Sequence, residues 1–289
     1  MSSRSREVDF NLQTELAMQT SIVAQFGYLD HPTYIRQRVK EITRSFRVSS
    51  DQLGKIPFDP FKCAESLGIV VRYVYLPRGI SGQLRRDLAP PVIEVECEHN
   101  QVRKRYTVCH ELAHLCFLKR SPALPSERGE INQIPKVQKR EERLCDRIAA
   151  ELLMPETAFL RHARVISPSF DAITSLAQTF DVSISATLIR LRECRAWSLG
   201  VLDCELDACR RTVRRRTAWL TVSRSIRHRQ DRSKVSMEID RTLEAVQHYI
   251  CKEGVYINTG PKLRFKDFNI HFLRTDSGTK IKAVALKQS

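Results

Sequence analysis

The chain has 289 residues, of which 42% are hydrophobic and 28% are charged, and its formal net charge is +15. This balance excludes a disordered chain and predicts a globular protein with a sizeable core. Because no run approaches the roughly 18 uninterrupted apolar residues that a membrane helix needs, no membrane partner is expected.

Residues 1–30 are predicted to form a polar tail, with a short helix around residues 12–26. No apolar segment follows the N-terminal charges, so we expect no signal peptide and a cytoplasmic location. The nine cysteines include no C-x-x-C pair. They are therefore expected to be free thiols in a reducing compartment, and a thiolate-rich zinc site is not expected.

Residues 34–46 predict an amphipathic helix, because apolar residues recur there at helical spacing. A short helix follows, with Asp59 as its N-cap and Gly68 at its end. Three runs typical of strands come next, at residues 69–76, 79–86 and 91–97. The turn residues between them predict a small, mainly antiparallel sheet.

The helix predicted over about residues 103–118 contains "VCHELAHLCF", in which His110, Glu111 and His114 form an H-E-x-x-H pattern. Positions i and i+4 share one helix face, so both imidazoles can bind one cation while Glu111 projects beside them. The alternative is two partly buried histidines without a metal. The apolar neighbours favour the metal, because burying these polar groups without partners is costly.

A second helix, predicted over about residues 138–153, offers the third protein ligand that a catalytic zinc site usually has. Glu142 and Asp146 are four residues apart and share a helix face. Glu142 would complete the ligand set, and Asp146 would accept the N–H of a ligating histidine. Glu141 is a rival ligand, and this charged helix end is alternatively a solvated surface. The residues alone leave these alternatives open.

Residues 169–194 predict two short helices separated near Asp181-Val182-Ser183, a pattern with helix-turn-helix character. Its arginines cluster late in the second helix, whereas recognition helices contact bases through their N-terminal residues. The alternative is a helical pair that packs against the preceding domain. Weaker signals follow: strands near 197–202, 218–222 and 268–273, a helix near 236–250, and a hairpin around Asp276-Ser277-Gly278.

Between residues 210 and 232 the chain has nine arginines and a single acid, Asp231. Arginines with an interleaved tryptophan suit phosphate contacts and base stacking, so nucleic acid is one expected partner. An acidic protein partner and a merely solvated face are the alternatives. The candidate contact residues are Arg210, Arg211, Arg214, Arg215, Arg216, Trp219, Arg224, Arg227 and Arg229.

Several of these segments, in the same order, are similar to motifs of the ImmA/IrrE family of zinc metallopeptidases. The resemblance spans about residues 33–195 and rests on "DPFKCAESLGIVV", "GISGQL", "PPVIEVE", "RKRYTVCHELAHL", "EERLCDRIAAELLMP" and "LAQTFDVSISATLIRL". It implies Glu142 rather than Glu141 as the acidic ligand, with Asp146 at the family's Asn/Asp position. Ile148 stands where many members have an aromatic residue, which we interpret as a difference in core packing.

The resemblance implies a zinc-dependent endopeptidase that cleaves a helix-turn-helix repressor and thereby relieves repression of stress-response or mobile-element genes. One Zn²⁺ per chain, held by His110, His114 and Glu142, would lower the pKa of a bound water and polarise the peptide carbonyl. Glu111 would take the water's proton and deliver it to the leaving amine. Tyr106, four residues before His110, is a candidate oxyanion donor, and the alternative is that it packs the start of the helix. Mn²⁺, Fe²⁺ or Co²⁺ also suits these ligands.

Two alternative functions remain at this stage. One is a DNA-binding regulator whose metal site is structural or sensory, although such a site has no use for the Glu111 carboxylate. The other is a metallopeptidase that the arginines of residues 210–232 tether to nucleic acid. Salt-sensitive nucleic-acid binding that survives Glu111→Gln would favour either alternative over a peptidase alone.

The expected fold class is α+β. A zincin-like metallopeptidase core, with its small sheet, H-E-x-x-H helix and Glu-ligand helix, is expected at residues 31–166. A helix-turn-helix-like segment at residues 167–196 and a smaller α+β domain at residues 197–289 are expected to follow. In the IrrE branch of the family that the chain resembles, a sensor-like domain follows the helical module, so the resemblance implies that the last domain senses a signal or binds a partner.

Overall fold

The computed structural model describes residues 32–117, 134–206, 213–253, 263–265, 267–274 and 280–287. The chain divides into two compact units. The first extends to Pro155 and includes Thr179–Ser183; the second comprises Glu156–Gln178 and Ile184 onward. The predicted polar tail at residues 1–30, with its short helix, lies outside the described residues. The functional boundaries at residues 166 and 196 stay predictions.

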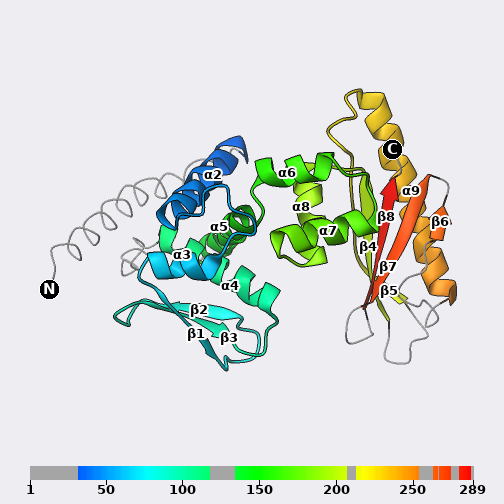
Figure 1. Cartoon of the computed structure of the whole chain (residues 1–289). Coiled ribbons are helices and arrows are strands. Elements are labelled where there is room, and N and C mark those ends of the chain that lie inside the picture. The colour runs from blue at the N-terminus through cyan, green and yellow to red at the C-terminus, as the bar shows by residue number, and fades with distance from the viewer. Residues whose placement is uncertain are drawn as a thin grey trace. The chain divides into compact units, whose positions relative to one another are not determined.

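Four α-helices and one short 3₁₀ helix build the described part of the first unit (Figure 1). They are α2 (Pro32–Ser49), α3 (Pro60–Ser66), α4 (Gln101–His114), η1 (Leu115–Phe117) and α5 (Ile134–Leu153). The predicted cap of α3 is present, because the Asp59 carboxylate accepts hydrogen bonds from the backbone N–H groups of Phe61 and Lys62. The chain then turns at Gly68, whose φ of +71° favours glycine.

The three strands of this unit form a mixed sheet in the order β1-β3-β2. The strands are β1 (Val70–Val74), β2 (Gly82–Arg85) and β3 (Val92–Glu96). β3 pairs antiparallel with β2 but parallel with β1, so the expectation of a mainly antiparallel sheet was wrong. The physical reason is burial: β3, the most deeply buried of the three strands, takes the centre, and this separates β1 from β2.

Helix α4 packs against strands β2 and β3 and against helix α5 (Figure 1). Its apolar residues are fully buried, including Val108 and Leu112. Arg105 near its start is also buried, and its guanidinium donates to the Phe58 carbonyl at 2.6 Å and pairs with Asp181 at 2.9 Å. These partners compensate the buried charge and hold α4 in place.

The second unit begins with helices α6 (Glu156–Arg164), α7 (Phe170–Phe180) and α8 (Ile184–Cys194). The last two agree with the predicted pair, whereas α6 had no counterpart in the sequence analysis. In the described ranges no single helix has the length and apolar character that crossing a bilayer requires. Taken together, α7 and α8 meet those two criteria, but they form a pair bent by 101°.

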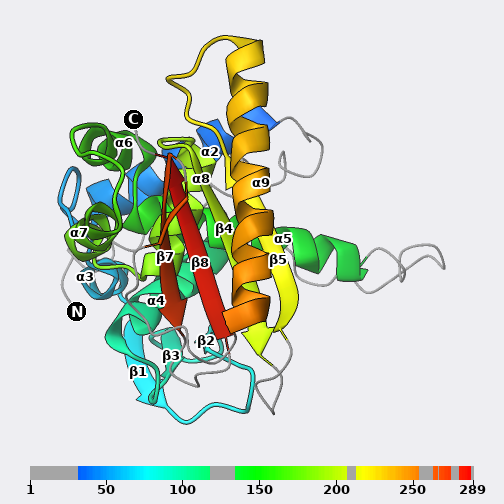
Figure 2. The same ribbon diagram turned by 90° about the vertical axis from the view of Figure 1, so that its right-hand side faces the viewer.

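An antiparallel sheet in the order β5-β4-β8-β7-β6 follows. Its strands are β4 (Leu199–Leu206), β5 (Val213–Thr221), β6 (Leu263–Phe265), β7 (Phe268–Arg274) and β8 (Lys280–Lys287), and α9 (Arg229–Glu253) lies across it (Figure 2). β7 and β8 pair as the predicted hairpin requires, although its turn residues lie outside the described ranges. The mixed α+β class is thereby confirmed.

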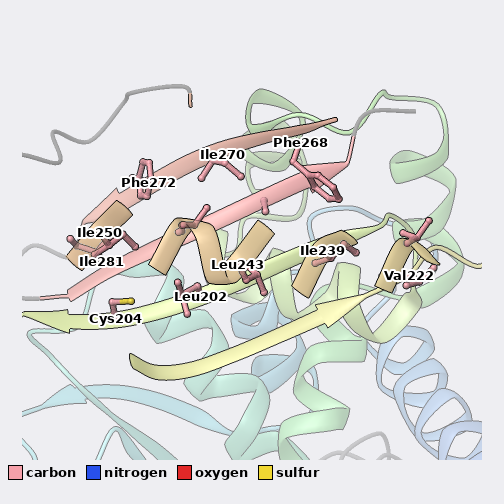
Figure 3. Packing of buried hydrophobic residues seen from close by; sticks show 14 residues of the cluster. Leu202, Cys204, Val222, Ile239, Leu243, Ile250, Phe268, Ile270, Phe272 and Ile281 are labelled. Atoms are coloured by element: carbon pink, nitrogen blue, oxygen red, sulfur yellow. The ribbon is translucent and has the colours of Figure 1, made fainter. Parts of the chain in front are cut away.

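Helix α9 packs on the sheet through one apolar cluster (Figure 3). Ile239 and Leu243 of the helix share this cluster with Leu202 of β4, and Ile250 lies near Ile281 and Phe272 of the neighbouring strands. Gly200 permits this close approach, because a Cβ at that position would lie 2.6 Å from Ile239 Cγ2. The helix and the sheet therefore form one core.

Replacing Ile239 by alanine is expected to destabilise the second unit by about 2–5 kcal/mol, because the side chain is fully buried and its removal leaves a cavity. Met237 on the same helix is 54% exposed, so Met237→Ala is the matched control and should change stability by less than about 0.5 kcal/mol. Both tryptophans, Trp197 and Trp219, lie in this unit, so denaturant unfolding followed by their fluorescence reports on it. Equal losses in the two variants would contradict the packing.

Candidate metal centre

The two histidines of the H-E-x-x-H pattern lie side by side at the C-terminal end of α4. Their ring centroids are 5.0 Å apart, and both side chains are mostly buried. The helical rise of one turn between positions i and i+4 produces this geometry. Two imidazoles at this separation can bind one cation.

Helix α5 brings Glu142 to both imidazoles. One carboxylate oxygen lies 3.1 Å from His110 Nε2, and the other lies 3.6 Å from His114 Nε2. A carboxylate and two imidazole nitrogens around one point form a donor set that suits a divalent cation such as Zn²⁺. The residues therefore fit a metal, and the geometry favours Glu142 as its carboxylate ligand.

Asp146 lies behind His110, on the side away from Glu142. Its Oδ1 atom is 3.1 Å from His110 Nδ1 and also accepts a hydrogen bond of 2.7 Å from the Tyr106 hydroxyl. Burial lowers the pKa of His110, but Asp146 and the other nearby carboxylates outweigh it and raise that pKa above 6.5. Asp146 thus occupies the position of an outer partner that orients the imidazole.

Glu141 and Cys145 both contact the Nδ1 atom of His114, which is the ring nitrogen that does not face Glu142. Glu141 Oε1 is 3.2 Å from His114 Nδ1, and Cys145 Sγ is 3.5 Å from the same atom. His110, His114 and Cys145 together form an alternative metal-binding group. We favour the set with Glu142, because burial raises the pKa of the Cys145 thiol and so disfavours the thiolate that binds metals.

Glu111 is only 7% exposed, and its carboxylate faces strand β2. Burial raises its pKa, although the charges of the two histidines and a hydrogen bond from the Leu84 backbone oppose the rise. Gly82 of β2 leaves room for it, because a Cβ there would collide with Thr107 Cγ2 and lie 3.4 Å from Glu111 Oε1. The segment "GISGQL" contains Gly82, but no local pattern in the sequence indicates this role for it.

These residues line one cleft of about 690 Å³ within the first unit. His110, Glu111, His114 and Glu142 face it from the helices, and residues 79–84, from strand β2 and the turn before it, bound it on the other side. Arg86 and Arg103 also line it, and no spacing in the sequence pointed to either. A cleft of this size, next to a strand edge, can accept a segment of polypeptide.

The arginines of residues 210–232 do not form a single group. Arg210 and Arg211 lie outside the described residues, and Arg214, Arg215 and Arg216 lie on β5. Trp219 has the Arg192 guanidinium 5.1 Å from its ring centroid, so an arginine covers one of its faces. Arg224 pairs with Glu156 at 3.4 Å, whereas Arg227 and Arg229 line a cleft of the second unit. The nucleic-acid interface predicted for this segment stays a prediction.

Comparison with known proteins identifies a family model that matches and a solved structure of similar fold. Residues 64–192 match the model of the peptidase M78 family, described as the IrrE N-terminal-like domain. A search of curated proteins found no match. A solved structure titled "Mycobacterium tuberculosis transcriptional regulator" is similar, with 14% identity and a TM-score of 0.54. The match covers 87% of this chain and 76% of that one, and at this identity it shows the fold alone.

Elemental analysis of purified variants distinguishes the two ligand sets. His114→Ala and Glu142→Gln are each expected to lose the bound metal, because each removes a donor that converges on the same point. Cys145→Ala is the matched control within the same helix and is expected to keep it. Loss of metal from Cys145→Ala, with retention in Glu142→Gln, would establish the thiol as the ligand instead.

The affinity for Zn²⁺ is expected to fall as the pH decreases through the raised pKa of His110, because only the neutral imidazole binds a metal. Asp146→Asn removes the main cause of the raised pKa of His110. The pH below which the affinity for Zn²⁺ begins to fall, which is the bend in the plot of affinity against pH, should therefore move to a lower value. At alkaline pH the same variant should bind Zn²⁺ about 10–100-fold more weakly. Chelator competition between about pH 5 and 8 measures both effects. An unmoved bend would contradict the assigned role of Asp146.

Proposed function

We propose, on the premise that residues 64–192 form an IrrE N-terminal-like domain of the peptidase M78 family, that this chain is a zinc-dependent endopeptidase. One observation supports it most directly. The Nε2 atoms of His110 and His114 converge on the Glu142 carboxylate, at 3.1 and 3.6 Å, next to the buried carboxylate of Glu111. A structural metal site would have no use for that fourth group.

His110, His114 and Glu142 would hold the metal. When bound, Zn²⁺ would polarise the peptide carbonyl and make water a better nucleophile. Glu111 accepts the proton of the attacking water and delivers it to the leaving amine. Its buried position raises its pKa, so that the carboxylate is a stronger base than an exposed glutamate. Asp146 keeps the imidazole of His110 oriented, and the Tyr106 hydroxyl supports Asp146.

Strand β2 supplies a surface for the substrate backbone. Within the described residues it pairs with β3 alone, so its other edge is free, and the cleft lies along residues 79–84. An extended peptide can add to such an edge through main-chain hydrogen bonds, which bind a polypeptide without regard to sequence. Arg86 and Arg103 line the same cleft and would contact substrate carbonyls or acidic side chains.

The substrate that we propose is a regulatory protein, a helix-turn-helix transcriptional repressor whose cleavage relieves repression of stress-response or mobile-element genes. This step rests on the family and on no individual residue. The similar solved structure is titled a transcriptional regulator, which agrees with a role in transcription.

That title also favours a second candidate, a DNA-binding regulator with a sensory metal site. The helix-turn-helix-like pair gives it limited support. Arg190 of α8 is only 7% exposed and pairs with Glu193 at 3.2 Å, so it is not available to bases. The peptidase accounts for Glu111, and the sensory site does not.

Glu111→Gln is expected to lower the cleavage of co-expressed helix-turn-helix repressors by at least about 10²–10⁴-fold, because the amide cannot accept the proton. The bound metal should remain, since Glu111 is not among the ligands. Glu65→Gln makes the same change on the exposed surface of α3 and should leave cleavage unchanged. Cleavage by Glu111→Gln at the wild-type rate would contradict the proposed mechanism. Nucleic-acid binding without cleavage of any repressor would favour the regulator.

A further inference from the structure

The second unit contains a basic cleft of about 700 Å³ that is formed by residues of α8, β5 and α9 and the segment between the last two. Five arginines and one acid line it: Arg192, Arg195, Arg227, Arg229, Arg232 and Asp240. These arginines come from two stretches of the chain that are far apart in sequence, residues 192–195 and residues 227–232. The cleft is therefore a product of the fold and not of one basic run.

Among the described residues this cleft has a net positive charge, because five arginines and a single acid, Asp240, line it. Within the described ranges no carboxylate lies within 4.0 Å of the guanidinium groups of these five arginines. Their neighbours Arg190 and Arg224, which do not line the cleft, pair with Glu193 and Glu156. Five like charges around one hollow repel each other, and a bound anion would remove that repulsion.

One face of α9 points into the cleft. Its lining residues Arg229, Arg232, Ser233, Ser236, Met237 and Asp240 recur at intervals of three and four, the spacing of a single helix face. Arg229 and Arg232 lie in the first turn, where the helix dipole disfavours cations. An anion bound there would offset this cost, and the two serine hydroxyls can donate hydrogen bonds to it.

The remaining wall of the cleft is apolar. Leu220 of β5 and Val222, which follows this strand, line it on one side, and Met237, which is 54% exposed, lines it from α9. An inorganic anion would use only the arginines and the serines. The combination of a cationic part and an apolar part suits a ligand with phosphates and an organic moiety, and the volume is that of a small-molecule site.

An extended nucleic acid fits this arrangement less well. Arg214, Arg215 and Arg216 precede Thr221, at the cleft, by five to seven residues of β5, a separation of about 20 Å along an extended strand. The arginines at residues 214–216 of β5 are thus separated along the strand from the end that reaches the cleft. Those at the cleft converge on one hollow, whereas nucleic-acid binding calls for a continuous basic track.

We propose that this cleft binds a phosphorylated small molecule of nucleotide size, with its phosphates on the arginines and its organic part against Leu220, Val222 and Met237. The site lies in a different unit from the metal centre, and the proposal does not depend on the peptidase activity. It assigns the second unit a ligand of defined chemical class.

Fluorescence anisotropy of mant-ATP, titrated with the full-length chain, tests the proposal. Arg229→Gln/Arg232→Gln is expected to weaken binding about tenfold or more, because charge-assisted contacts to phosphate are lost. Arg161→Gln/Arg241→Gln removes the same charge from exposed positions outside the cleft and should change binding by less than about twofold. Arg227→Gln, on the exposed segment before α9, should also weaken binding and serves if the double variant misfolds.

Competition identifies the part of the ligand that is recognised. Inorganic triphosphate should displace mant-ATP, and adenosine should do so poorly. Glu142→Gln should bind mant-ATP normally, which separates the cleft from the metal centre. Equal weakening in the two double variants, no binding of mant-ATP or triphosphate by the wild-type chain, or much tighter binding of a single-stranded oligonucleotide would each overturn the proposal.

Discussion

The candidate metal centre depends on one constraint: most of helix α4 packs into the core, yet its inner face contains two histidines, Glu111 and Arg105. Apolar packing of Val108 and Leu112 fixes the helix between the sheet and α5. Every polar group on it then needs a partner, because an uncompensated polar group in the core is costly. Arg105 donates a hydrogen bond to the Phe58 carbonyl and pairs with Asp181. The two histidines contact the acids of α5. The acidic end of α5 is thus the electrostatic complement of α4.

The same packing explains why the two acids at residues 141 and 142 differ. Successive residues on a helix point about 100° apart, so they cannot face the same atom. Glu142 contacts both Nε2 atoms, and Glu141 contacts His114 Nδ1 from the other side. The residues alone left these two acids as rivals. Their contacts now suggest complementary positions, with Glu142 at the metal and Glu141 behind a ligand, as Asp146 is behind His110.

Several features were predicted because their causes are local. The Asp59 cap, the turn at Gly68 and the break between α7 and α8 each depend on a few consecutive residues. Ile148, which departs from the family pattern, is 1% exposed and lies in the core, as expected for a packing difference. Helix α6 was missed, and so was β6, a strand of three residues that is too short to show a periodic pattern.

By itself, the sequence determined the pairing of His110 with His114, since the helical period sets it, and it placed Glu142 and Asp146 on one face of a second helix. Only the tertiary structure decided that β3 lies between β1 and β2, because pairing depends on which strand is buried most deeply. It also divided the arginines of residues 210–232 and brought Arg192 of α8 and Arg195, which follows α8, to the basic cleft. Contacts between distant segments, unlike helix faces and caps, have no period in the sequence, so folding alone establishes them.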